Sequence, residues 1–139
     1  MDDHRAIADL IARQFAHLSW TYGAGPDADG FMEDFHPDAQ LFASTRPARA
    51  QTAAKFLERM EGLSQTSLRA FAERCPASKI LVFGNIAVAV ASCEAIENGR
   101  DRSNNVEMML LVKGSDGWKI AAQAWDRVPA GDDFPDWLS

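Results

Sequence analysis

Hydrophobic positions follow a helical period in the first half of the chain and a strand-like period in the second half. Five apolar residues recur at the three- and four-residue spacing of one helical face: Ile7, Leu10, Ile11, Phe15 and Leu18. This spacing predicts a helix over residues 3–21, with Asp2 and Asp3 at its start. A second broad apolar face predicts a helix over residues 48–63, and one or two helical turns are expected around Phe31–Phe35.

Strand-like alternation replaces the helical period after the polar cluster at residues 64–67. One short strand is predicted earlier in the chain, where the turn-forming residues Pro37 and Asp38 precede Leu41 and Phe42. Further strands are predicted at 69–75, 78–83, 86–97, 104–113 and 117–127. Asn-Gly and Asp-Gly pairs separate several of these runs, and strands joined by such short turns must be antiparallel.

The order of elements predicts one α+β domain over residues 1–139, with N-terminal helices packed on a curved antiparallel sheet. Both parities of the strands at 86–97 and 104–113 are apolar, so both faces of the sheet should be buried. Helices cover only one face. We therefore expect a homodimer formed through the other face.

Composition and charge narrow the classes of protein. The chain is 47% hydrophobic and 24% charged, which excludes a disordered or low-complexity protein. Fourteen Lys and Arg against twenty Asp and Glu give a net charge of −6, which argues against a nucleic-acid partner. No apolar run has membrane-spanning length and the N-terminus is acidic, so a cytoplasmic location with no membrane partner is expected. Cys75 and Cys93 are interpreted as unpaired packing residues.

Motifs of several enzyme classes are absent from the sequence. The three histidines, His4, His17 and His36, lack the HExxH or HxH spacing of a metal site. The chain also has no GxSxG, P-loop or GxGxxG motif, which argues against serine hydrolases, nucleotide-triphosphate enzymes and dinucleotide-binding enzymes. No cofactor and no metal is therefore expected.

Three segments resemble the nuclear transport factor 2-like superfamily, which includes ketosteroid isomerases, scytalone dehydratase and SnoaL-like polyketide cyclases. They are Phe35-His36-Pro37-Asp38-Ala39, Phe83-Gly84-Asn85-Ile86-Ala87, and Asp116-Gly117-Trp118-Lys119-Ile120 with Ala124-Trp125-Asp126. The likeness covers nearly the whole chain and is strongest to an uncharacterised bacterial branch. It implies a cone-shaped, half-open barrel with a pocket between the helices and the concave face of the sheet. It implies no single function, because this fold hosts enzymes and binding modules.

Asp126 is the candidate general base. If Trp118 and Ile120 face the helices, unbroken alternation places Ala122, Ala124 and Asp126 on the same concave face. A carboxyl group half-buried among aromatic rings would have a raised pKa and could transfer a proton. The alternative is that Asp126 ends the strand at the surface and pairs with an arginine.

Glu107, Met109 and Cys93 are candidate ligand-binding residues. Glu107 and Met109 share one parity on their strand, and Cys93 belongs to one parity of the preceding strand. If these parities face the pocket, Glu107 is a second carboxylate there, and two carboxylates in unequal environments can divide acid and base roles. The opposite parity would place Glu107 in solvent.

Aromatic residues near the first glycine-rich loop complete the candidate site. The resemblance implies that the end of the first helix and the first strand form the pocket mouth, which brings in Trp20, Tyr22 and Phe42. Two functions then remain. One is binding of a small, largely apolar molecule, which the absence of histidine from residues 78–125 favours. The other is a cofactor-independent isomerase, cyclase or lyase that uses Asp126.

The C-terminal tail, residues 129–139, contains two prolines and three aspartates but also apolar side chains. We expect Phe134 and Trp137 to dock beside the sheet or across the dimer, because burial of an aromatic side chain offsets the ordering of a few residues.

Overall fold

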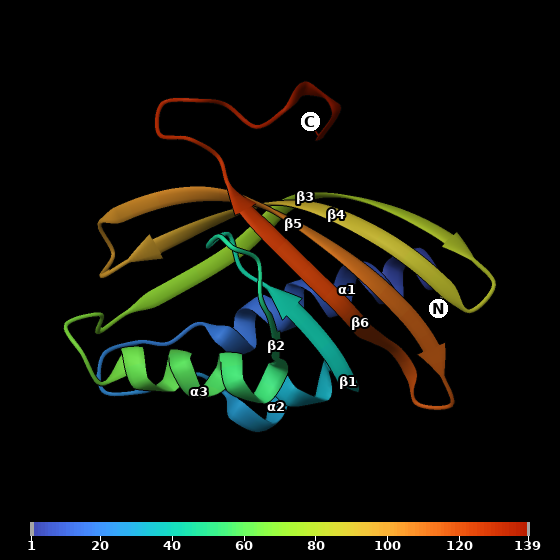
Figure 1. Ribbon diagram of the computed structural model, residues 1–139, viewed down its shortest axis with the longest axis horizontal. Helices are drawn as coiled ribbons and strands as arrows, with labels where there is room; N and C mark the ends of the chain where they lie inside the picture. Colours follow the sequence, from blue (N-terminus) through green and yellow to red (C-terminus); the bar gives the residue numbers. More distant parts are fainter. Residues whose placement is uncertain (1, 139) are drawn as a thin grey trace.

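Three helices lie against the concave side of one curved, six-stranded sheet in the computed structural model, which describes residues 2–138 (Figure 1). The helices are α1 (Asp3–Leu18), α2 (Ala28–Glu33) and α3 (Ala53–Ser64), and a 3-10 turn, η1 (Asp136–Leu138), ends the chain. The strands are β1 (Phe35–Phe42), β2 (Ala50–Thr52), β3 (Phe71–Phe83), β4 (Ile86–Glu97), β5 (Asp101–Gly114) and β6 (Gly117–Arg127). The predicted α+β architecture is confirmed.

The predicted helices are present, with shifted ends. Asp2 caps α1 by accepting a hydrogen bond from the Arg5 N–H, and α1 stops at Leu18 because Ser19 has an extended backbone. The second long helix begins at Ala53 rather than at residue 48. Thr52 caps it by accepting a hydrogen bond from the Lys55 N–H. The residues just before the cap form β2, a strand that the sequence analysis did not predict.

The sheet has the order β2-β1-β6-β5-β4-β3, and the predicted antiparallel meander runs from β3 to β6. One pair corrects the antiparallel prediction, because β1 runs parallel to β6. No short turn joins β1 to β6, so hairpin geometry does not fix their relative direction. The strands predicted at 69–75 and 78–83 form one strand, β3, whose register shifts between Arg74 and Ala77.

Small side chains line the concave face of β4. Ala87, Ala89, Ala91 and Cys93 are at most 4% exposed and pack beneath the helices. Cys93 forms a disulfide bond with Cys75 on β3, so the prediction that both cysteines are unpaired is wrong. The antiparallel pairing of β3 with β4 brings the two cysteines together, with their Cα atoms 4.0 Å apart.

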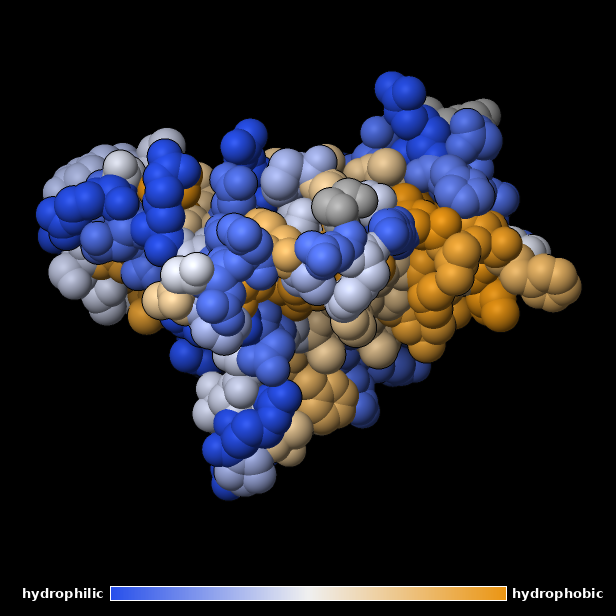
Figure 2. Space-filling view, turned by 90° about the horizontal axis from the view of Figure 1, so that it is seen from above, coloured by the Kyte–Doolittle hydropathy of each residue, from blue (hydrophilic) through white to orange (hydrophobic). Residues whose placement is uncertain are grey.

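The convex face of the sheet carries the exposed apolar side chains. They are Leu81, Phe83, Ile86, Val88, Met108 and Leu110, each at least 45% exposed. They form the orange area on the right of Figure 2. No helix within residues 2–138 is long and apolar enough to cross a membrane.

The C-terminal tail lies over the convex face, where η1 contacts β3 and β4 (Figure 1). Docking of the tail beside the sheet is confirmed, but the side chains differ in burial from the prediction. Leu138 is 2% exposed, whereas Trp137 remains 53% exposed and lines a groove over the sheet.

Candidate functional site

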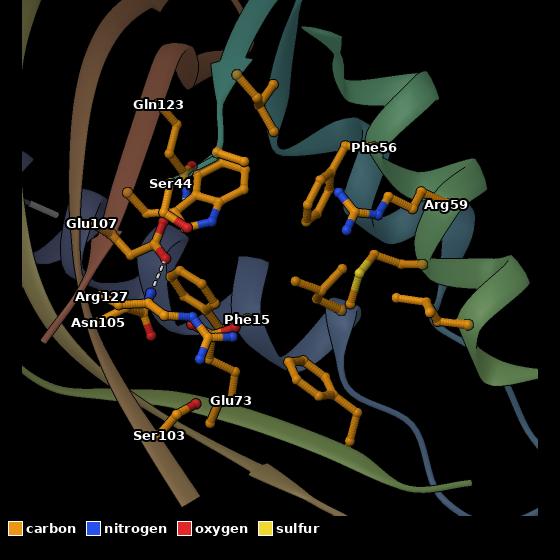
Figure 3. A pocket seen from close by; sticks show the side chains of 18 of the residues that line it. Phe15, Ser44, Phe56, Arg59, Glu73, Ser103, Asn105, Glu107, Gln123 and Arg127 are labelled. Carbon is orange, nitrogen blue, oxygen red and sulfur yellow. Dashed lines mark hydrogen bonds between the residues drawn. The ribbon is translucent and has the colours of Figure 1, made fainter. Parts of the chain in front are cut away.

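A cavity of about 350 Å³ lies between the concave face of the sheet, α1 and α3. Its apolar wall contains Phe15, Phe56, Met60, Leu63, Phe71 and Trp125. The polar side chains that line it include Gln14, Glu73, Ser103, Asn105, Glu107 and Gln123. Figure 3 shows Phe56 and Arg59 of α3 opposite the polar side chains of the sheet.

Glu107 is the most enclosed carboxyl group of this cavity, with 3% of the residue exposed. Its Oε1 accepts a hydrogen bond of 2.7 Å from Nε2 of Gln123, and its Oε2 accepts one from Nδ2 of Asn105. The parity that places Glu107 toward the helices is therefore the correct one, and solvent exposure is excluded.

Glu73 is a second carboxyl group in the cavity, and the sequence analysis did not identify it. It lies on β3, opposite Ala95 of β4, whereas Glu107 of β5 lies opposite Ala91 of the same strand. Asn105 lies between the two positions along β5 and hydrogen-bonds to both carboxyl groups.

Burial and mutual repulsion make both carboxyl groups weak acids. Burial raises the pKa of Glu73 to about 7, and a hydrogen bond from Asn105 acts in the opposite direction. Burial first, and then the charge of Glu73, raise the pKa of Glu107 well above its ordinary value. Hydrogen bonds from Gln123 and Asn105 oppose this rise. Near neutral pH the pair therefore holds protons that exposed glutamates would have lost.

A chain of side-chain amides connects Glu107 to the first helix. Nε2 of Gln14 donates to Oε1 of Gln123 at 3.1 Å, and Gln123 in turn donates to Glu107. Oε1 of Gln14 is buried and has no hydrogen-bond partner within residues 2–138. Both carboxyl oxygens of Glu107 accept hydrogen bonds in this arrangement.

Asp126 lies outside the cavity, so the prediction that it faces the pocket is wrong. Leu110 pairs with Ala122 while Leu111 pairs with Ile120, which leaves Ala121 as an extra residue in β6. This bulge reverses the parity of the rest of the strand. Gln123 and Trp125 consequently point into the cone in place of Ala122, Ala124 and Asp126. The Asp126 side chain is 70% exposed and lies 3.7 Å from Nη2 of Arg46.

The predicted aromatic site residues lie elsewhere. Trp20 is buried, donates from Nε1 to the Leu68 carbonyl at 3.1 Å, and packs on Phe71. Tyr22 is 76% exposed, with the Arg69 guanidinium 5.8 Å from its ring centre. Phe42 lines the groove on the convex face.

Cys93 and Met109 face the concave side as predicted, but they belong to the hydrophobic core and do not line this cavity. Of the seven predicted site residues, Glu107 alone lines it. Trp125, which was missed, forms part of its aromatic wall through an edge contact with Phe56.

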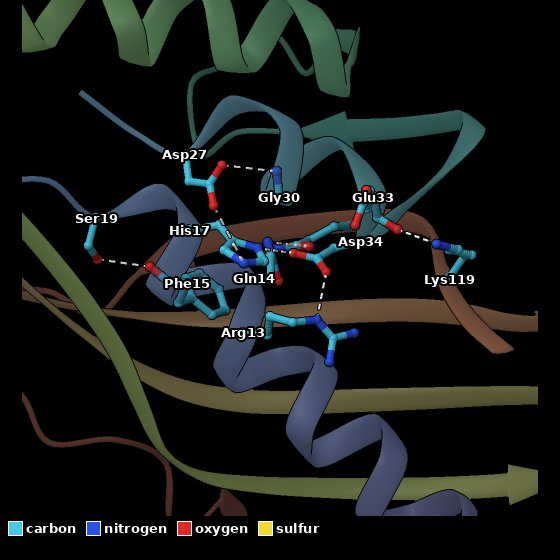
Figure 4. A network of polar contacts seen from close by, with 11 residues as sticks. Arg13, Gln14, Phe15, His17, Ser19, Asp27, Gly30, Glu33, Asp34 and Lys119 are labelled. Atoms are coloured by element: carbon cyan, nitrogen blue, oxygen red, sulfur yellow. Dashed lines mark hydrogen bonds and ion pairs between the residues drawn. The ribbon is translucent and has the colours of Figure 1, made fainter. Parts of the chain in front are cut away.

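A separate polar cluster joins α1, α2 and β1 (Figure 4). Asp34 is 1% exposed, and it contacts Nε of Arg13 at 3.1 Å and Nδ1 of His17 at 2.9 Å. Asp27 caps α2 through the Gly30 N–H and lies 3.9 Å from Nε2 of His17. This cluster fixes the helices relative to the sheet edge. Within residues 2–138 no group of three or more His, Cys, Asp or Glu is placed to hold a metal ion.

Solved structures share this fold at low sequence identity. A nuclear transport factor 2-like protein with a cystatin-like fold from Novosphingobium aromaticivorans has a TM-score of 0.71 and 16% identity, over 93% of this chain and 84% of that chain. One of unknown function from Methylobacillus flagellatus has a TM-score of 0.62 and 18% identity, over 92% and 94%. A chain assigned as a calcium/calmodulin-dependent kinase II association domain from Exiguobacterium sibiricum has a TM-score of 0.69 and 12% identity, over 94% and 97%.

No protein-family model and no curated protein matches the sequence. The structural likeness nevertheless agrees with the sequence motifs: the chain has the nuclear transport factor 2-like, cystatin-like fold. At these identities the likeness defines the fold alone, so any statement about function must come from the cavity itself.

Proposed function

We propose that this protein binds a small, largely apolar molecule in the cone-shaped cavity. The observation that carries the proposal is the cavity itself, about 350 Å³ of space between aromatic walls and buried polar groups. Small-molecule sites occupy roughly 300–1,000 Å³ and combine apolar walls with a few polar groups that orient the ligand. Phe56 and Trp125 supply such a wall, and Glu107 with its amide partners supplies the polar end.

A ligand screen with a cavity-filling variant tests this proposal. Ala95 lines the cavity on β4, and Ala95→Leu would occupy part of the space. Ala54→Leu, on the exposed face of α3, is the matched control. Compounds that raise the melting temperature of the native protein should lose at least tenfold in affinity with Ala95→Leu and keep it with Ala54→Leu. Equal affinity for both variants would place the binding elsewhere.

Proton transfer on the bound molecule is a second candidate function. It is favoured by two carboxyl groups, Glu73 and Glu107, that line one cavity and have raised pKa values. Deuterium exchange at a ligand carbon in D₂O, followed by NMR, tests it. Exchange that is catalysed by the native protein and lost in Glu107→Gln would support an isomerase or lyase. Binding without exchange would leave a binding protein.

We further propose that a second copy of the chain covers the convex face of the sheet. That face carries a groove of apolar side chains to which Trp137 of the tail contributes. Phe83 is 84% exposed and Leu81 73%, and a contiguous exposed patch of apolar side chains is typical of a protein–protein interface. The structural similarity to a chain assigned as an association domain supports self-assembly through this fold.

A further inference from the structure

We propose that the cavity takes a small molecule whose polar end is a protonated amine, with an apolar body against the aromatic wall. The inference rests on the proposed function, since it names the class of molecule for the same site. The ammonium group would lie against Glu73 and Glu107, which line the same cavity from β3 and β5 and share Asn105 as a hydrogen-bond partner.

Two enclosed carboxyl groups without a cationic partner carry the argument. The side chains that hydrogen-bond to them are neutral amides: Asn105 donates to Glu107 and also to Glu73, and Nε2 of Gln123 donates to Glu107. The carboxyl group of Glu73 makes no ion pair with any cation within residues 2–138 at 4 Å or less. Glu107 likewise makes no ion pair within residues 2–138, so a ligand that brings a positive charge together with several N–H donors supplies the cationic partner that both carboxylates lack.

Gln14 is an independent sign that the cavity takes a ligand with more than one N–H donor. The residue is 2% exposed, lines the cavity, and leaves Oε1 buried with no hydrogen-bond partner within residues 2–138. A buried acceptor without a donor costs about 1–3 kcal/mol. A ligand N–H that reaches Oε1 of Gln14 relieves this cost.

The positive charges of the arginines that line the cavity repel a bound cation only weakly. Arg59, Arg127 and the half-buried Glu97 also line the cavity, and both arginines are exposed. Solvent and salt screen exposed charges within about 8–10 Å. Glu73 and Glu107 are enclosed, where charge interactions are weakened far less. Carboxylates also disfavour an anionic head group at the same position, so the two glutamates discriminate between amines and acids.

The raised pKa values are consistent with this geometry. An ammonium group between the carboxylates would lower both pKa values, and each carboxyl that is protonated in the free protein would then release its proton. Affinity for an amine should accordingly rise with pH above 6. The rise should approach tenfold per pH unit where one proton is released per amine bound.

Three matched probes test the inference: 2-phenylethylamine, 2-phenylethanol and 3-phenylpropionate. Calorimetry at pH 6, 7 and 8 in two buffers of different ionisation enthalpy measures affinity and proton release together. At pH 8 the amine should bind at least tenfold more tightly than the alcohol, and the acid should bind most weakly. At pH 7 the amine alone should release a proton.

Neutral variants show which groups discriminate. Glu73→Gln and Glu107→Gln should each reduce the preference for amine over alcohol to threefold or less, whereas Glu58→Gln, on the exposed face of α3, should preserve it. Equal binding of amine and alcohol to the native protein, or binding without proton release, overturns the inference and leaves the proposed function standing. If none of the three probes binds, both are overturned.

Discussion

Nε2 of Gln123 donates a 2.7 Å hydrogen bond to Oε1 of Glu107, and the bulge at Ala121 makes this contact available. Without the extra residue, alternation along β6 would direct Gln123 to the convex face and leave Glu107 with one amide partner. The bulge thus places an amide donor and an aromatic wall residue, Trp125, beside a buried carboxyl group. A single unpaired residue determines which side chains of β6 can meet a ligand.

Neutralising either buried glutamate should stabilise the protein at high pH. A carboxyl group whose folded pKa is raised makes folding less favourable as pH rises above its unfolded value of 4.5 toward the folded one. For Glu73, whose pKa is about 7, Glu73→Gln should add about 3 kcal/mol to the free energy of unfolding at pH 8 and less than about 1 kcal/mol at pH 5. Urea unfolding at both pH values measures the difference.

Glu107→Gln should show the same direction of change. The new amide can donate to Oε1 of Gln123, whose own amide can then turn and donate to Oε1 of Gln14. Glu58→Gln, at an exposed position, serves as the control for both variants. A gain in stability that is the same at pH 5 and pH 8 would show that the two carboxyl groups titrate normally.

The signals that the sequence revealed are local ones. Asn98-Gly99 marks the end of one strand and Asp116-Gly117 marks the start of another. The predicted ranges of these strands, 86–97 and 117–127, are those observed. The buried apolar face of α1 was also predicted correctly, because helical periodicity depends on residues only three and four positions apart. These elements supply most of the fold.

The cavity depends on relationships that no local pattern encodes. The segment Ile120–Gln123 contains two consecutive alanines and no glycine or proline that would mark the bulge. Glu73 and Glu107 meet only because β3, β4 and β5 stand side by side. The sequence therefore made Glu107 a candidate without deciding which parity of its strand faces the pocket, misplaced Asp126, and gave no reason to select Glu73.

Loss of the disulfide bond should destabilise the β3–β4 pair. Cys75 and Cys93 are 18 residues apart, and a bond closing a loop of that size contributes about 3 kcal/mol by restricting the unfolded chain. Cys93→Ala matches the neighbouring alanines of β4 in size, so the variant should fold but unfold at lower denaturant concentration. Thiol titration of the denatured native protein should detect no free cysteine, and two free thiols would contradict the bond.

Removing the Asp34 carboxylate should loosen the attachment of α1 to the edge of the sheet. Asp34 is buried and accepts hydrogen bonds from the half-exposed Arg13 and from His17, and a hydrogen bond to a charged group contributes about 1.5–3 kcal/mol. Asp34→Ala should therefore lower the melting temperature by several degrees, whereas Asp38→Ala, at an exposed position of β1, should not. Equal melting temperatures would show that the cluster carries little energy.

The convex face offers the clearest test of assembly. Leu81 and Phe83 are among the most exposed large apolar residues of the structure, so replacing them should cost the folded monomer little. In a dimer formed through this face both would be buried, and each apolar side chain would contribute about 1.5–3 kcal/mol to association. Light scattering of the native protein should give twice the chain mass of 15.3 kDa.

The double variant Leu81→Asp/Phe83→Asp should give the mass of one chain, because two carboxylates would have to be buried in the interface. Tyr22→Asp, at a site that is 76% exposed and outside this groove, should remain a dimer. A native protein that scatters as one chain would contradict the assembly and leave the cavity proposals unaffected, since the cavity lies on the opposite face of the sheet.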